Sequence, residues 1–194
     1  MSLHITLGSM YAGKTTKLIN EYNIAKGMNK FPIIIDFDCN ANPKYDEDTR
    51  VKRGTMKNHD DIEIENVVVT TYLMKPKLVQ LCLGHDIILI NEAQFFNDLQ
   101  KFVKYMVSND KTVFIYGLDG DFEREPMGQI LNLIPFCDSV TKIKGMCDKC
   151  KIKPSIFSHR VSKNKEKVLI DPKQYIPVCR SCYNNLNPMK SIEL

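Results

Sequence analysis

Residues 8–15 have the composition and spacing of a loop that binds phosphate groups. They match the pattern G-x-x-x-x-G-K-[ST]. Two glycines let the backbone turn tightly with its N–H groups inward, and a helix that begins there adds the positive end of its dipole. In such a loop the lysine reaches the β- and γ-phosphates of a nucleoside triphosphate, and the threonine hydroxyl ligates Mg²⁺. The residues expected to hold the triphosphate and its Mg²⁺ are Gly8, Ser9, Tyr11, Ala12, Gly13, Lys14, Thr15 and Thr16.

The segments on either side of this loop support phosphate binding. Residues 3–7 alternate apolar and polar side chains like a strand, and residues 17–26 space their apolar side chains like a helix. A glycine-rich turn that matches the pattern by chance is the alternative. The order of strand, loop and helix argues against it.

A second polar group follows a run of four aliphatic residues. Residues 87–90 predict a buried parallel strand, and Asn91 and Glu92 come directly after it. Ligands of open α/β sheets bind at the carboxyl ends of the strands. Glu92 could therefore belong to the Mg²⁺ shell or take a proton from an attacking hydroxyl. The alternative is that both residues merely end the strand at the surface.

The other patterns place these groups on an α/β fold. Apolar runs predict strands at residues 31–37, 67–69 and 112–117, and helices are predicted at residues 76–83 and 99–107, the second capped by Asn97. Residues 38–61 are interpreted as a long loop. Strands alternating with helices indicate a parallel sheet with flanking helices and right-handed crossovers, and we assign it to a domain at residues 1–140.

Four of the seven cysteines form two C-x-x-C pairs with 28 residues between them. Two such pairs supply the four thiolates of a tetrahedral zinc site with no open position, which is structural. A redox C-x-x-C is the alternative, but it needs no second pair. We therefore predict a zinc-binding domain at residues 141–194, with the intervening Lys-rich segment as a lid over a ligand. The predicted ligands are Cys147, Cys150, Cys179 and Cys182.

Composition narrows the function classes. The hydrophobic fraction of 43% and charged fraction of 26% are those of a globular protein, and no apolar run reaches the ~18 residues of a membrane span. A strand at the very start leaves no room for a signal peptide, so we expect a cytoplasmic location. Residues 141–194 hold 12 Lys and Arg against 4 Asp and Glu, whereas residues 1–140 hold 15 against 19. A basic C-terminal segment could meet nucleic acid or phosphates.

Together these motifs resemble the thymidine kinases of the cellular and poxvirus type. The resemblance runs from about residue 5 to residue 183. Besides the phosphate loop and the cysteine pairs, it rests on D-T-R at 48–50, N-E-A-Q-F-F at 91–96, L-D-G-D-F at 118–122 and I-L-N-L-I-P at 130–135. It implies a RecA-like sheet with a zinc-ribbon and lasso domain. It also implies transfer of the ATP γ-phosphate to the 5′-hydroxyl of thymidine or deoxyuridine in pyrimidine salvage, by a homotetramer that needs Mg²⁺ and Zn²⁺.

The resemblance also assigns roles to single residues. Glu92 would be the general base on the acceptor hydroxyl, with Lys14 on the phosphates and Arg124 neutralising charge near the transferred phosphate. Asn91 stands where the family has an aspartate that helps to hold the Mg²⁺ shell, which should weaken metal binding by roughly 1 to 2 kcal/mol. The residues that the resemblance places around the nucleoside are Met10, Asp48, Arg50, Phe95, Leu118, Phe122, Met127, Ser158 and Tyr175.

Three further positions depart from the family pattern. Asp171 and Pro172 precede Tyr175 in the lasso, where the family has two adjacent glycines, and the proline restricts the backbone. Met127 replaces a phenylalanine of similar volume. Two other functions stay open: a P-loop ATPase stimulated by nucleic acid, which the basic C-terminal segment suggests, and a nucleotide-binding member without catalysis, which Asn91 suggests. We expect this protein to bind neither a membrane nor nucleic acid.

Overall fold

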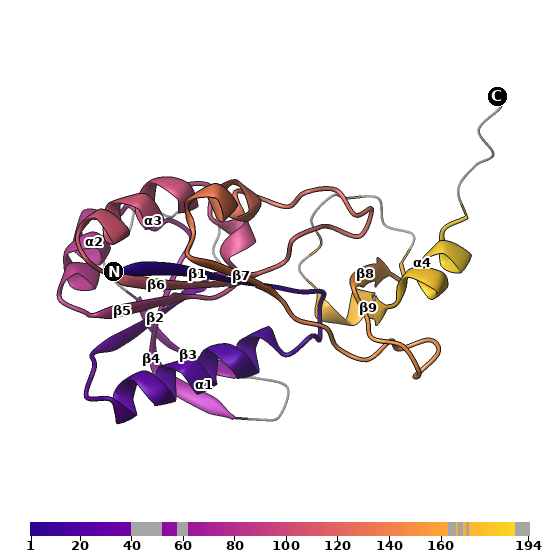
Figure 1. Cartoon of the computed structure of the whole chain (residues 1–194), viewed down its shortest axis with the longest axis horizontal. Coiled ribbons are helices and arrows are strands. Elements are labelled where there is room, and N and C mark those ends of the chain that lie inside the picture. The colour runs from indigo at the N-terminus through magenta and orange to yellow at the C-terminus, as the bar shows by residue number, and fades with distance from the viewer. Residues whose placement is uncertain (40–51, 58–61, 163–165, 167–168, 170, 189–194) are drawn as a thin grey trace.

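A mixed sheet forms the larger part of the molecule (Figure 1). The computed structural model describes residues 1–39, 52–57, 62–162, 166, 169 and 171–188. Within them the sheet has seven strands in the order β3-β4-β2-β5-β6-β1-β7. All neighbours pair in parallel except β3, which is antiparallel to β4. The strands are β1 Ser2–Leu7, β2 Pro32–Phe37, β3 Lys52–Lys57, β4 Glu63–Thr70, β5 Ile87–Ile90, β6 Thr112–Gly117 and β7 Ser139–Lys142.

Helices cover both faces of this sheet, because successive side chains of a strand point to opposite faces. In β2, Ile33 and Ile35 pack in the cluster that includes α2 (Pro76–Leu83) and α3 (Leu99–Ser108). Ile34 faces the other way and packs with α1 (Lys14–Gly27). Figure 1 shows α1 on one side of the sheet and α2 and α3 on the other. The described residues of this part also include the short 3₁₀ helices η2 (Ala93–Phe95) and η3 (Ile130–Phe136).

The apolar periodicity predicted these central elements correctly, and the edges of the sheet depart from the prediction. The segment interpreted as a long loop contains β3, a polar edge strand in which Met56 is buried. The opposite edge strand, β7, is exposed at all four residues. Edge strands bury little, so their sequences carry no apolar run. The cap residue of α3 is Asp98, not Asn97 as predicted, and its carboxylate accepts hydrogen bonds from the backbone N–H groups of Leu73 and Met74.

The C-terminal part lies at one end of the sheet (Figure 1). It contains an antiparallel pair, β8 (Phe157–Arg160) and β9 (Tyr175–Val178), the short η4 (Pro172–Gln174) and α4 (Arg180–Leu186). Its small core includes two of the paired cysteines with Val178 and Tyr183. The domain boundary expected after residue 140 falls inside β7, and the division into two domains stays a prediction. No helix among the described residues has the length and apolar character to cross a membrane.

Candidate active site

Three neighbouring strands deliver the candidate catalytic groups to one edge of the sheet. β6 lies between β1 and β5 and runs parallel to both. The carboxyl ends of the three strands therefore meet. The phosphate loop follows β1, Glu92 follows β5, and Leu118 follows β6.

The phosphate loop has the backbone geometry that its sequence predicts. Gly13 takes a left-handed conformation with φ 87° at the start of α1. A side chain at Gly8 would lie 2.8 Å from the Ile143 carbonyl oxygen. Lys14 Nζ donates hydrogen bonds to the carbonyl oxygens of Gly8 and Ser9, at 3.1 and 2.8 Å. Burial lowers the pKa of Lys14, while Glu92 and Asp119 act in the opposite direction.

A cavity of about 190 Å³ joins this loop to the other strand ends and to the C-terminal part. Twelve residues predicted from the sequence line it together: Met10, Gly13, Lys14, Thr15, Thr16, Glu92, Phe95, Leu118, Phe122, Met127, Ser158 and Tyr175. Six predicted residues are not in its lining: Gly8, Ser9, Tyr11, Ala12, Asn91 and Arg124. Asp48 and Arg50 lie outside the described residues.

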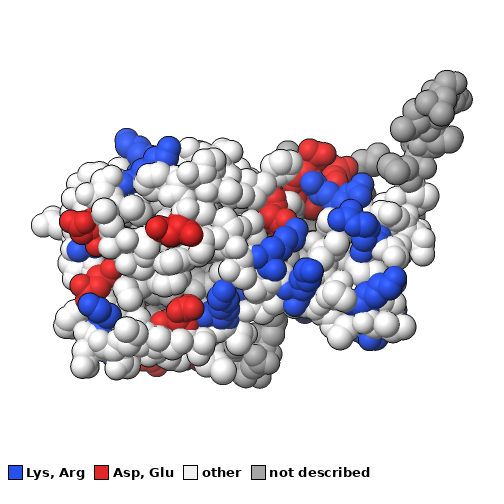
Figure 2. All heavy atoms as spheres, in the orientation of Figure 1, with Lys and Arg blue, Asp and Glu red and all other residues white. Residues whose placement is uncertain are grey.

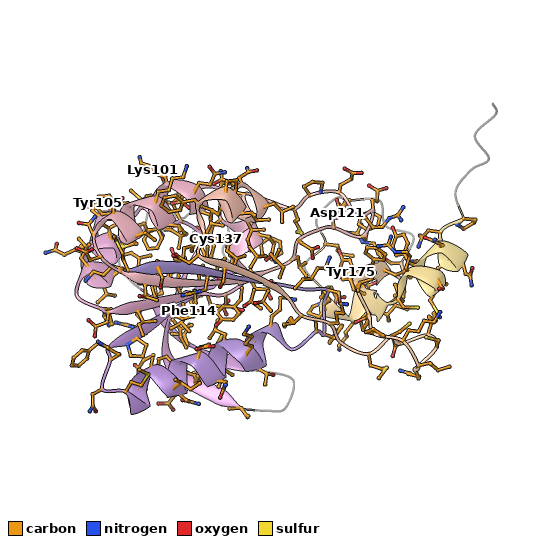
Figure 3. The ribbon with its side chains drawn as sticks, viewed as in Figure 1. Lys101, Tyr105, Phe114, Asp121, Cys137 and Tyr175 are labelled. Carbon is orange, nitrogen blue, oxygen red and sulfur yellow. The ribbon has the colours of Figure 1, made fainter. Side chains whose placement is uncertain are left out.

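The structure adds six lining residues to which the sequence analysis assigned no site role: Cys39, Gly120, Asp121, Leu169, Asp171 and Pro172. Asp121 is buried, and its Oδ1 accepts the backbone N–H groups of Glu123 and Glu125. Asp121 and Tyr175 both lie where the sheet meets the C-terminal part (Figure 3). Four of these six lining residues had a signal in the sequence: Gly120 and Asp121 lie in the L-D-G-D-F motif, and Asp171 and Pro172 depart from the family pattern.

Aromatic and apolar side chains form the wall of the cavity away from the phosphate loop. Phe95 packs against Phe37, with ring centroids 5.1 Å apart. The Arg160 guanidinium lies 3.8 Å from the ring centroid of Phe122 and also donates to the Tyr175 hydroxyl. Such a wall suits a flat, partly apolar ligand.

Hydrogen bonds connect the C-terminal part to the phosphate loop, one of them between the Ser9 and Ser155 hydroxyl groups at 3.4 Å. The backbone N–H of Met10 donates to Ser158 Oγ at 3.0 Å, and the Tyr11 hydroxyl donates to the Pro172 carbonyl oxygen at 2.8 Å. Burial raises the pKa of Tyr11, and the nearby Asp171 carboxylate adds to the effect. The lasso therefore contacts the loop that would hold the phosphates.

Arg124 does not line the cavity that Lys14 and Glu92 share. It takes a left-handed conformation with φ 74°. Its guanidinium carbon lies 4.7 Å from the ring centroid of Tyr183 and 5.8 Å from that of Phe157. These rings belong to the C-terminal part, where the Tyr183 hydroxyl also donates to the Phe122 carbonyl oxygen at 2.6 Å.

A partly buried carboxylate accompanies Asn91 at the strand ends. The amide nitrogen Asn91 Nδ2 donates to Asp36 Oδ1 at 2.9 Å. Burial raises the pKa of Asp36 to about 6; the Asn91 and Phe37 hydrogen bonds act against this, while Glu92 adds to it. Nothing in the sequence analysis singled out Asp36, because an aspartate at the end of a strand resembles any surface aspartate.

The four paired cysteines form one cluster in the C-terminal part. Their sulfur atoms all lie within 4.8 Å of one another. Four thiolates about 2.3 Å from a zinc ion are spaced roughly 3.8 Å apart, so the cluster fits Zn²⁺. Burial raises the pKa of Cys147, but hydrogen bonds from the backbone at residues 150, 179 and 149 outweigh it and lower the pKa to about 6. That favours the thiolate form, which binds metal.

Basic side chains gather on the C-terminal part. Figure 2 shows Lys and Arg over that part of the visible face, beside a smaller acidic group. The charge asymmetry found in the sequence therefore also appears in the folded protein.

Replacing Asp36 by Asn should stabilise the protein at neutral pH. The folded-state pKa of about 6 lies above the ordinary value of 3.8. The carboxyl group therefore favours the folded state below about pH 4, and this contribution is lost as the pH rises through 6. At pH 7.5 the Asp36→Asn protein should be more stable by up to about 3 kcal/mol. Urea unfolding at pH 7.5 and pH 4 measures this. A variant no more stable than the original at pH 7.5 contradicts the raised pKa.

Replacing Cys179 by Ser should remove the bound zinc and unfold the C-terminal part. A four-cysteine site contributes on the order of 10 kcal/mol through the metal. The melting temperature should therefore fall by at least about 10 °C. Elemental analysis of the purified protein should find one zinc per chain in the original and none in the variant. Cys137→Ser is the control, because Cys137 is a partly buried cysteine outside the cluster. Equal zinc contents in the three proteins contradict the assignment.

Comparison with known proteins shows to which family this chain belongs. The family model described as thymidine kinase matches residues 1–183. The thymidine kinase of Yaba monkey tumor virus is 35% identical over 186 residues, covering 95% of this chain and 96% of the relative. That of Choristoneura biennis entomopoxvirus is 32% identical over 190 residues, covering 96% and 98%. The cytosolic thymidine kinase of Homo sapiens is 34% identical over 182 residues, covering 93% and 72%. The family resemblance inferred from the motifs is thus confirmed, and the chain belongs to the thymidine kinase family.

Proposed function

We propose that this chain transfers the γ-phosphate of ATP to the 5′-hydroxyl of thymidine or deoxyuridine, with Glu92 as the general base. The observation that carries the proposal is the shared cavity. Lys14 and Thr15 of the phosphate loop line it together with Glu92 and the aromatic wall of Phe95 and Phe122. A nucleoside bound against that wall would place its 5′-hydroxyl between the Glu92 carboxylate and the phosphates of ATP.

Each group would have one task in the transfer. Glu92 would accept the proton of the acceptor hydroxyl, and Lys14 would bind the β- and γ-phosphates. Most of the rate gain would come from holding the two substrates in line. Arg124 would have to leave Tyr183 to reach the transferred phosphate.

The residues around the phosphate loop fit Mg²⁺, which prefers oxygen ligands. Thr15 offers a hydroxyl, Asn91 a carboxamide oxygen, and Asp36 a carboxylate beside Asn91. When bound, Mg²⁺ would neutralise negative charge on the β- and γ-phosphates. Asp36 brings a negative charge next to Asn91, and this supports catalysis over the non-catalytic alternative.

The remaining parts of the proposal rest on the family. We infer that the zinc ion is structural, that the enzyme acts in pyrimidine salvage as a homotetramer, and that residues 141–194 form a separate domain. A cytoplasmic location is supported by the human relative, whose name includes "cytosolic".

Phosphorylation of radiolabelled nucleosides with ATP and Mg²⁺ tests the function directly. Thymidine and deoxyuridine should be converted to monophosphates, and deoxycytidine and the purine deoxynucleosides should not. Single-stranded DNA should leave ATP turnover unchanged. ATP hydrolysis that DNA stimulates, without nucleoside product, would point to the ATPase function. No turnover at all would point to a nucleotide-binding protein without catalytic activity.

Replacing Glu92 by Gln should lower turnover of thymidine by at least about a hundredfold, because the base that takes the hydroxyl proton is lost. Binding of ATP and Mg²⁺, measured by calorimetry, should be unchanged. Glu123→Gln is the matched control: Glu123 is exposed on the loop after β6 and does not line the cavity. If Glu92→Gln keeps most of the turnover, Glu92 is not the base.

A further inference from the structure

One buried side chain connects Glu92 to the end of strand β6. Gln94 lies in η2, two residues after Glu92, and is 4% exposed. Its Oε1 accepts the backbone N–H of Leu118 at 3.0 Å. Its Nε2 donates to Glu92 Oε2 at 2.6 Å. Both ends of the amide are therefore used.

The backbone fixes which end of this amide faces Glu92. The Leu118 N–H can only donate, so the Gln94 atom that meets it must be the carbonyl oxygen. The NH₂ group then points at the Glu92 carboxylate, which accepts hydrogen bonds when ionised. A hydrogen bond to an ionised acceptor is shorter and roughly twice as strong as a neutral one.

Two glycines let the backbone pack closely against Gln94. A side-chain carbon at Gly117 would lie 2.5 Å from Gln94 Oε1. One at Gly128 would lie 2.0 Å from the Gln94 carbonyl oxygen, and Gly128 has a φ of +62° that other residues rarely adopt. A side chain at either glycine would therefore displace the backbone or the amide of Gln94.

Glu92 needs such support because its own backbone is in an unfavourable region. Its φ of 49° and ψ of 38° are left-handed, which is uncommon for a residue other than glycine. Gln94 holds one of its carboxylate oxygens. The other, Oε1, has no hydrogen-bond partner among the described residues, and Glu92 lines the cavity. A carboxylate held at one oxygen presents the other in a fixed direction.

We propose that Gln94 is a positioning residue for Glu92, holding one carboxylate oxygen so that the other faces the acceptor hydroxyl. This inference rests on the proposed function, in which Glu92 takes the proton of that hydroxyl. The same amide also binds the backbone N–H of Leu118, which lines the cavity wall. It therefore sets the distance between the bound nucleoside and the general base Glu92. Errors of about 1 Å in such placement can cost a hundredfold in rate.

Gln94→Glu removes the donor that faces Glu92 and adds a second carboxyl group beside it. The new carboxylate still accepts the Leu118 N–H, but it presents an acceptor where Gln94 presents a donor. The turnover number for thymidine should fall at least about tenfold, with the KM for thymidine within about twofold.

Gln129→Glu is the matched control. Gln129 also bridges two backbone groups, since it accepts the Gln100 N–H and donates to the Asn97 carbonyl oxygen, and it does not line the cavity. Its turnover should be unchanged.

A double-mutant cycle distinguishes positioning of the base from general support of the fold. Single-turnover rates are compared for Glu92→Gln with and without Gln94→Glu. If Gln94 acts through the Glu92 carboxylate, the second substitution should change the residual rate by less than about twofold. The same tenfold loss in both backgrounds, or full turnover of Gln94→Glu alone, overturns the inference while the proposed function stands. An original protein that phosphorylates no nucleoside overturns both.

Discussion

The pairing of β6 with β1 on one side and β5 on the other is the interaction on which the site depends. The register aligns Leu7 with Gly117 and Ile90 with Ile115. A shift of one residue would turn each side chain to the opposite face and would move Glu92 away from Lys14. The buried Val113 and Ile115 of β6 pack with both neighbours, so the apolar core that stabilises the sheet also fixes the distances of the site.

The sequence allowed the central elements and the groups that follow them to be predicted. The phosphate loop is a local pattern, and its meaning depends only on the strand and helix beside it. The four aliphatic residues before Asn91 and Glu92 likewise indicate a buried strand without any tertiary information. Both predictions rest on neighbours in the chain, which is why they were available before the fold was known.

Contacts between distant segments could not be predicted in this way. The sequence indicated a lid between the cysteine pairs, but it did not show that Leu169, Asp171 and Pro172 would line the cavity. The cysteine cluster and the β8–β9 pair set that path of the chain. The burial of Asp36 depends on β4 and β5 beside it. The polar strand β3 forms because β4 offers an edge to pair with. Each of these features is decided by the surroundings of a segment.

The hydrogen bond from the Tyr11 hydroxyl to the Pro172 carbonyl oxygen has a thermodynamic consequence. Tyr11 belongs to the phosphate loop, and Pro172 lines the cavity in which we propose that the nucleoside binds. Where two binding sites share a contact, a ligand that strengthens or breaks it at one site changes affinity at the second, and the coupling free energy is the same in both directions. The two proposed substrates should therefore not bind independently of each other. The Tyr11 hydroxyl is one contact through which binding of either substrate would change the affinity for the other.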